Sequence, residues 1–389
     1  MNFRLKHIPV FIAMAIGGLG AMPSHAADTI CSVVYDDGSG LAAHQITAAN
    51  ASSLGSTIPF PLTTVAIASN FYQPAISLVK DFMVSAGYDF DAIGICHNAT
   101  GHLMQEITGG GTVGYPSGSY AAHPAAITGE WLSAAIGYKY SLLLAANETA
   151  PKQLASSLTK KYTISSPLLY AKGIPALLLN PNEIEKFNPQ LTAAALFVAS
   201  TAGSPEGVYY SATAGTGGTG PIAMSYPSYL SPIGVALPSA APYGQQAKTI
   251  VTAMGQWPTA APSLTSVTGS GVCATTCSAP PIGSKPGVCQ YDNIDLTYAA
   301  AKCAGSGIKA GWVSLAQIRE GGDTEYIAFP AYPIAQWGVL LDAGSPSRNK
   351  VGRELWQFMN LLNPSTVNAG LGGGKSWNQW LDGKGYGGL

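Results

Sequence analysis

Short apolar runs alternate with amphipathic stretches in the first third of the chain. Residues 63–68 form a largely apolar run, which is typical of a buried parallel strand. In residues 72–86 the apolar side chains recur at helical spacing, at Ala75, Ile76, Val79, Phe82 and Met83. A second pair follows, with a strand expected over 90–95 and a helix over 101–107. This alternation predicts an α/β fold with mixed, mainly parallel sheets flanked by helices, and a ligand site beyond the carboxyl ends of the strands.

The rest of the pattern continues in the same way. It predicts strands over 138–146 and 174–179, a helix over 241–254 with a proline in its first turn, a helix over 294–303 capped by Asn293, and a strand ending within 311–315. Two segments, 203–238 and 265–286, are rich in Gly, Ser, Thr and Pro and are expected to be surface insertions.

Two strand-to-helix joints carry hydroxyl side chains. Ser69 follows the run 63–68, and Thr100 precedes the second predicted helix. The first amides of a helix have no partner within the helix, and the dipole is positive there. Two such starts that face each other can therefore bind an oxyanion without Lys or Arg. The alternative is that both hydroxyls only cap their helices.

Composition narrows the class of protein. Charged residues make up 10% of the chain and the formal net charge is −1. With no basic stripe to displace counterions from a phosphate backbone, a nucleic-acid partner is excluded. Two Gly-rich stretches, 109–114 and 215–220, match the dinucleotide-binding pattern, but neither joins a strand to a helix as such a loop requires. The stretch 372–376 resembles the end of a P-loop but has Ala369 where the first Gly belongs.

The N-terminus has the pattern of an export signal. Arg4, Lys6 and His7 precede an apolar stretch over 8–19, and small residues lead to an expected cleavage after Ala26. The apolar stretch is too short to span a membrane, and no later stretch is long enough. We therefore expect a periplasmic protein that does not span the membrane. Its six cysteines are then expected to form disulfides, in any of 15 pairings: Cys31, Cys96, Cys273, Cys277, Cys289 and Cys303.

The order and spacing of six segments resemble the periplasmic molybdate-binding proteins of ABC importers, a branch of the type II solute-binding fold. The segments are Ala66-Ile67-Ala68-Ser69, residues 100–107, Ala241-Pro242-Tyr243-Gly244-Gln245-Gln246-Ala247, Asn293-Ile294, residues 310–315, and Tyr332-Pro333-Ile334 leading to residues 339–341.

The resemblance implies two lobes with the ligand in the cleft between them. Lobe I would comprise 27–172 and 330–389, and lobe II 173–329. The ligand would be a tetrahedral oxyanion, molybdate or tungstate, delivered by a monomer to an ABC permease without catalysis and without a cofactor. The ligand-binding residues implied are Ser69, Thr100, Tyr243, Ile294 and Ser314.

The chain departs from this pattern just before Thr100, where Cys96-His97-Asn98-Ala99 replaces a loop usually rich in Ser and Gly. Cys96, His97 and His102 make a metal ion an alternative ligand, because thiolate and imidazole bind copper and zinc. An organic solute is a further alternative. A secreted hydrolase and an adhesive surface protein are rival classes, although no Gly-x-Ser-x-Gly motif occurs.

Overall fold

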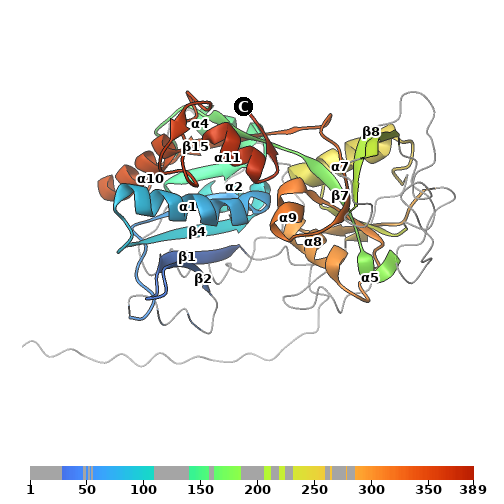
Figure 1. Ribbon diagram of the computed structural model, residues 1–389, viewed down its shortest axis with the longest axis horizontal. Coiled ribbons are helices and arrows are strands. Elements are labelled where there is room, and N and C mark those ends of the chain that lie inside the picture. Colours follow the sequence, from blue (N-terminus) through green and yellow to red (C-terminus); the bar gives the residue numbers. More distant parts are fainter. Residues whose placement is uncertain are drawn as a thin grey trace, which may run out of the picture.

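A computed structural model shows two mixed sheets, each flanked by helices, lying side by side (Figure 1). The structure describes residues 29–46, 50, 53, 56–108, 140–156, 162–184, 206–211, 219–223, 231–258, 263–264, 277 and 285–389. We call each sheet with its helices a lobe, the first lobe being the one that contains the earliest strand. The predicted signal segment and most of the second predicted insertion, 265–286, lie outside the described residues. The first predicted insertion, 203–238, is partly described. Its residues 206–211, 219–223 and 233–236 are strands of the second sheet, and 233–236 are buried in the sheet interior, so the expectation of a surface insertion is wrong there.

The first lobe is built on an eight-stranded sheet in the order β18-β6-β15-β5-β3-β4-β1-β2. Its strands are β1 (Ile30–Asp36), β2 (Leu41–Ile46), β3 (Thr63–Ala68), β4 (Ala92–Asn98), β5 (Leu142–Ala145), β6 (Leu168–Gly173), β15 (Ile334–Leu340) and β18 (Tyr386–Gly387). Parallel pairing is confined to β3 with β4 and β5. The other pairs are antiparallel.

Helices cover both faces of this sheet, and β3 is therefore buried on both sides. Val65 and Ile67 pack with α1 (Tyr72–Ala86), α10 (Pro346–Phe358) and α11 (Trp377–Gly383). Ala66, on the opposite face, packs with α2 (Thr100–Thr108) and α4 (Thr149–Ser156). The alternation follows from the two-residue period of a strand. A small hairpin of β16 (Val367–Asn368) and β17 (Lys375–Ser376) lies beside α11.

The second lobe has an eight-stranded sheet in the order β11-β12-β10-β13-β7-β14-β8-β9. Its elements are β7 (Pro175–Leu179), α5 (Pro181–Ile184), β8 (Glu206–Ser211), β9 (Thr219–Ala223), β10 (Ile233–Ala236), α7 (Pro242–Ala253), β11 (Ser263–Leu264), β12 (Val288–Tyr291), α8 (Ile294–Lys302), β13 (Ala310–Ser314), α9 (Leu315–Glu320) and β14 (Glu325–Ala328). One face packs against α7 and the other against α8 and α9.

The chain passes between the two sheets twice. Ile174 alone separates β6 of the first lobe from β7 of the second, and residues 329–333 separate β14 from β15. In both sheets the antiparallel pairs involve the strands next to these crossings, such as β7 and β15, and the hairpins at the sheet edges. The α/β class is therefore confirmed, but the expectation of mainly parallel sheets is wrong. The strands on both sides of each crossing pair antiparallel with their neighbours, and so do the strands of the edge hairpins.

Most predicted elements agree closely with the structure. The strand 63–68 and the helix 72–86 have the bounds of β3 and α1, and Asn293 caps α8 by accepting a hydrogen bond from the amide of Leu296 at 2.9 Å. The second strand begins two residues later than expected, because Phe90 lies in a turn and is 92% exposed. Of the expected strand 138–146, the described residues 140–146 contain the shorter β5.

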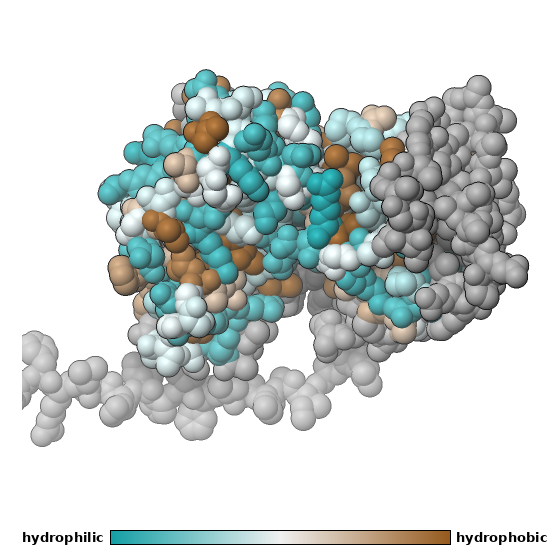
Figure 2. Space-filling model, viewed as in Figure 1, coloured by the Kyte–Doolittle hydropathy of each residue, from teal (hydrophilic) through white to brown (hydrophobic). Residues whose placement is uncertain are grey.

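The cysteine prediction is confirmed where the chain is described. Cys31 and Cys96 face each other on the antiparallel strands β1 and β4 and form a disulfide, with Cα atoms 4.0 Å apart. Cys277 and Cys289 form another. Within the described ranges no helix is long and apolar enough to cross a membrane. Figure 2 shows hydrophilic and hydrophobic residues interspersed over the visible face of the first lobe.

Candidate functional site

The carboxyl ends of β3 and β4 meet the second lobe. Ser69 and Asn70 follow β3, His97 is the next-to-last residue of β4, and all three side chains are buried. Ser69 is the first residue of the short helix η2 (Ser69–Phe71), which continues into α1. The start of η2 has no side-chain cap. The serine hydroxyl instead lies 3.4 Å from Nδ1 of His97, so the capping-only interpretation does not describe Ser69.

His97 connects the two lobes through a polar contact. Its Nδ1 lies 3.0 Å from Oδ2 of Asp295, which belongs to the first turn of α8 in the second lobe. The imidazole ring stacks on Tyr72, with centroids 3.9 Å apart and an interplanar angle of 21°. The hydroxyl of Tyr72 lies 2.5 Å from that of Ser32. Burial raises the pKa of Tyr72, so the stacking partner of His97 is a neutral phenol at physiological pH.

A residue in the first turn of α9 holds the Asp295 side chain by a hydrogen bond. Oδ1 of Asp295 accepts a hydrogen bond from Nε2 of Gln317 at 2.8 Å. Gln317 in turn forms a capping box with Ser314, whose hydroxyl accepts from the Gln317 amide at 3.1 Å. Ser314 is thus engaged in a helix cap. Its connection to the site runs through Gln317 to Asp295.

Tyr243 makes a second polar link between the lobes at η2. It lies in the first turn of α7, after Pro242, and its hydroxyl accepts hydrogen bonds from Nε2 of Gln336 at 2.9 Å and Nδ2 of Asn70 at 3.4 Å. Tyr386 donates to the carbonyl oxygen of Asn70 at 2.6 Å, and Tyr170 donates to Oε1 of Gln336 at 2.8 Å. Burial raises the pKa of all three tyrosines, so this network is held together by neutral hydroxyls and amides.

Small apolar residues fill the rest of the boundary between the lobes. Ala68, Ala99 and Ala146 lie at or just beyond the ends of β3, β4 and β5, and they share one buried cluster with Ala240 and Ala241 of the second lobe. At the start of α2, the amide of Gly101 donates to the carbonyl of Ala240 at 3.5 Å, a long hydrogen bond. The hydroxyl of Thr100 accepts from the amide of Ala146 at 3.1 Å. The lobes therefore meet closely at this boundary.

The structure brings some of the expected ligand-binding residues together. Ser69, Tyr243 and Ile294 converge on the boundary around η2, whereas the hydroxyls of Thr100 and Ser314 have structural partners. Asp295, Asn70 and Gln336 were not among the residues expected from the sequence. An acidic residue in the first turn of a helix is ordinary, so nothing in the sequence pairs Asp295 with a histidine about 200 positions earlier.

The metal alternative built on Cys96, His97 and His102 is wrong. The sulfur of Cys96 is bonded to Cys31 and cannot act as a thiolate ligand. Within the part of the chain that the structure describes, no group of three or more His, Cys, Asp or Glu side chains is placed to hold a metal ion.

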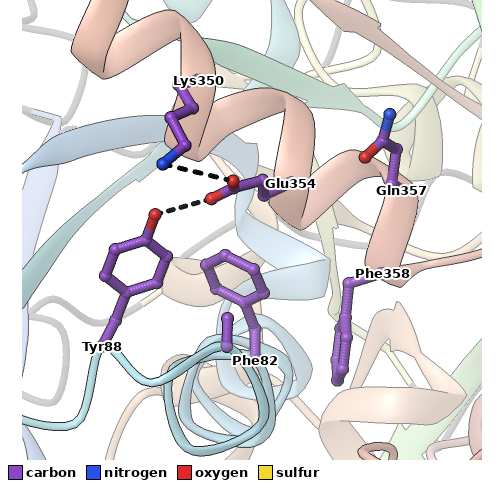
Figure 3. Close-up of a pocket in the computed structure, with 7 residues that line it drawn as sticks. Phe82, Tyr88, Lys350, Glu354, Gln357 and Phe358 are labelled. Atoms are coloured by element: carbon purple, nitrogen blue, oxygen red, sulfur yellow. Dashed lines mark hydrogen bonds and ion pairs between the residues drawn. The ribbon is translucent and has the colours of Figure 1, made fainter.

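A surface pocket also lies in the first lobe, between α1 and α10 (Figure 3). Phe82 and Phe358 line it, and Glu354 accepts a hydrogen bond from the hydroxyl of Tyr88 at 2.6 Å while pairing with Lys350 at 3.7 Å. This pocket is at the C-terminal end of α1, and about 20 Å of helix separates it from Ser69. It is therefore separate from the site at the lobe boundary.

No protein-family model and no curated protein sequence matches the chain. Solved structures that align with it include the substrate-binding domain of a candidate molybdenum ABC transporter from Clostridium difficile, at 10% identity, a TM-score of 0.42, and 84% of this chain and 98% of that one covered. The substrate-binding protein of an ABC transporter from Agrobacterium tumefaciens aligns at 10% identity and a TM-score of 0.42, over 85% and 78% of the two chains. Peb3 from Campylobacter jejuni aligns at 10% identity and a TM-score of 0.37, over 84% and 100%. A likeness at this level assigns neither a ligand nor a function.

Proposed function

We propose that this chain is a periplasmic solute-binding protein that captures a small tetrahedral oxyanion between its lobes and delivers it to an ABC permease. The observation that carries the proposal is the meeting of two helix starts from different lobes. The start of η2 contacts α8, with the buried His97 side chain between Ser69 and Asp295. Helix starts supply unpartnered amides and a positive dipole, which is the environment that an anion requires.

The donors in this proposal come from both lobes. Ser69 contributes its hydroxyl, and the helix starts at Thr100, Tyr243 and Ile294 contribute backbone amides. The imidazole of His97 adds a ring nitrogen within reach of Ser69. Ser314 acts indirectly, by holding Gln317. Molybdate and tungstate are the oxyanions that the sequence resemblance implies.

Closure of the lobes is the proposed mechanism. We place the hinge at Ile174 and residues 329–333. One moving body is lobe I, made of 27–172 and 330–389, and the other is lobe II, made of 173–329. Buried polar contacts cross the boundary at Tyr243 and His97 and favour the closed arrangement. A ligand that binds donors of both lobes stabilises that arrangement by its difference in affinity for the closed and open forms. The closed monomer is then the species that the permease binds.

Calorimetry and thermal unfolding test the proposal. Molybdate, tungstate, sulfate, phosphate, zinc and copper are titrated into the protein, and a true ligand raises the midpoint of unfolding by linkage. Ser69→Ala should weaken oxyanion binding at least tenfold. Ser141→Ala is the matched control, because Ser141 is also a buried serine of the first lobe but bonds Thr63 at the opposite end of β3. Stabilisation by a metal or an organic solute, without any response to an oxyanion, would contradict the proposal.

A hydrolase is the second candidate, because a serine, Ser69, and a carboxylate, Asp295, both lie next to the imidazole of His97. A nucleophilic triad uses both ring nitrogens, one for the serine and one for the carboxylate. Here both oxygens approach Nδ1. Ser69 also lacks the strained backbone of a nucleophile elbow, since Asn360 is the only non-glycine residue with positive φ in the described ranges. Turnover of generic ester or phosphoester substrates, lost in Ser69→Ala, would favour the hydrolase.

A further inference from the structure

Asp295 places a hydrogen-bond acceptor in a site otherwise made of donors. Its Oδ1 is bonded to Gln317, and its Oδ2 faces His97 at 3.0 Å. Within the described ranges Oδ2 accepts no hydrogen bond beyond this ion pair. The side chain is 32% exposed, whereas that of His97 is 6% exposed. Oδ2 itself is buried against His97, so it can accept from a ligand's proton donor only when the lobes separate and the ligand takes the place of His97.

The carboxylate is fixed in this position. It lies in the first turn of α8, where the helix dipole favours a negative charge. Gln317 holds its other oxygen, and the capping box with Ser314 orients Gln317. A ligand that enters beside Ser69 and His97 must therefore accommodate Asp295, because moving the carboxylate would break these contacts and leave Gln317 without its acceptor.

A carboxylate in the site distinguishes tetrahedral oxyanions that carry a proton at neutral pH from those that do not. Molybdate, tungstate and sulfate carry no proton at neutral pH, so they offer only acceptors and repel Asp295. Hydrogen phosphate retains a P–O–H group, which donates to a carboxylate in a short, charge-assisted hydrogen bond. A site that hydrogen-bonds one hydroxyl of its ligand discriminates strongly against an analogue without that hydroxyl, because its own buried polar group is then left unpaired.

Resting on the proposed function, we propose that Asp295 selects oxyanions that carry a proton, so that the site prefers hydrogen phosphate to molybdate, tungstate and sulfate. In the bound state the phosphate hydroxyl donates to Oδ2 of Asp295, and the other phosphate oxygens accept from Ser69 and His97. The ligand thus enters between the two partners of the ion pair. Asp295 is a specificity residue of the site, and Ser314 and Gln317 position it.

Calorimetric titration of the full chain with inorganic phosphate, molybdate and sulfate at neutral pH tests this assignment. We expect phosphate to bind about 100-fold or more tightly than the other two. In Asp295→Asn the amide replaces an acceptor with a donor and removes the charge, so phosphate affinity should fall, molybdate affinity should rise, and their ratio should shift by about 100-fold. Asp295→Ser should shift the phosphate to molybdate ratio in the same direction. It allows the test to be made even if Asp295→Asn does not fold.

Asp323→Asn is the matched control, because Asp323 lies in the second lobe but pairs with Lys302 and Tyr298 instead of His97. It should leave the phosphate to molybdate ratio unchanged. If the wild type binds molybdate or sulfate as tightly as phosphate, or if Asp295→Asn leaves the ratio unchanged, the selectivity assignment is overturned while the proposed oxyanion function stands. If no oxyanion binds the wild type, the proposed function fails and this assignment fails with it.

Discussion

The hydroxyl of Tyr243 in the second lobe lies 2.9 Å from Nε2 of Gln336 in the first. Tyr243 stands in the first turn of α7, whereas Gln336 lies on β15 immediately after the chain has crossed back between the sheets. Both residues are buried. Tyr243 also bonds Asn70 of η2, and His97 lies beside Ser69 of the same short helix, so the two lobes are connected by polar groups as well as by the alanine-lined boundary.

Tyr243→Phe should lower the free energy of unfolding by about 1–3 kcal/mol, because it removes the acceptor of two buried amide donors. Tyr291→Phe is the control. Tyr291 is equally buried, but its hydroxyl has no hydrogen-bond partner in the described part of the chain, so its loss should cost little. Urea unfolding of both variants measures the difference. Equal losses in the two variants would contradict the role assigned to the Tyr243 hydroxyl.

Gly173→Ala, next to the proposed hinge residue Ile174, should disturb the hydrogen bond between Tyr243 and Gln336. A Cβ atom at Gly173 would overlap the hydroxyl of Tyr243 and Nε2 of Gln336, both of which are buried and cannot move freely. We expect a loss of about 1–3 kcal/mol in unfolding free energy and an altered oxyanion affinity. Gly383→Ala is the control, because a Cβ atom there meets no neighbour within 4 Å. An unperturbed Gly173→Ala variant would show that the network is not tightly packed.

Ser314→Ala and Ser376→Ala compare two identical caps. Each serine forms a capping box with a glutamine three residues later, so each substitution should cost about 1 kcal/mol of stability. Only Ser314 orients the glutamine that holds Asp295. Chemical unfolding should therefore report similar losses, whereas calorimetry should report a changed phosphate to molybdate ratio for Ser314→Ala alone. A change of this ratio in both variants would indicate a general loosening of the fold.

The protein should lose stability at alkaline pH between about 10 and 12. The hydrogen bond to Glu354 raises the pKa of Tyr88 to about 12, and burial raises the pKa of Tyr298 to about 12. Above the ordinary pKa of about 10 the unfolded chain releases these protons while the folded chain retains them, so the free energy of unfolding falls as the pH rises.

Ultraviolet titration of tyrosine, together with urea unfolding at each pH, measures this effect. In Tyr88→Phe the loss over this interval should be smaller, because one of the shifted phenols is absent. A flat stability profile from pH 10 to 12 would contradict the assignment.

Local elements were predictable because their causes are local. The apolar run before Ser69 and the helical spacing after it give the bounds of β3 and α1, and the side chain of Asn293 closes the start of α8 as a cap residue should. The direction of strand pairing was less predictable. Apolar runs do not encode whether a neighbouring strand runs parallel or antiparallel, because that depends on how the connections place the strands in the sheet.

By itself the sequence determined the α/β class, the helix starts at Ser69, Tyr243 and Ile294, and the expectation that cysteines pair, because each follows from spacing, capping or composition. Only the tertiary structure decided that His97 meets Asp295, that Tyr243 reaches Asn70 and Gln336, and that Cys96 is bonded to Cys31. These contacts join residues 65 to about 200 positions apart. Their geometry is set by how two sheets pack against each other, which no local pattern along the chain specifies.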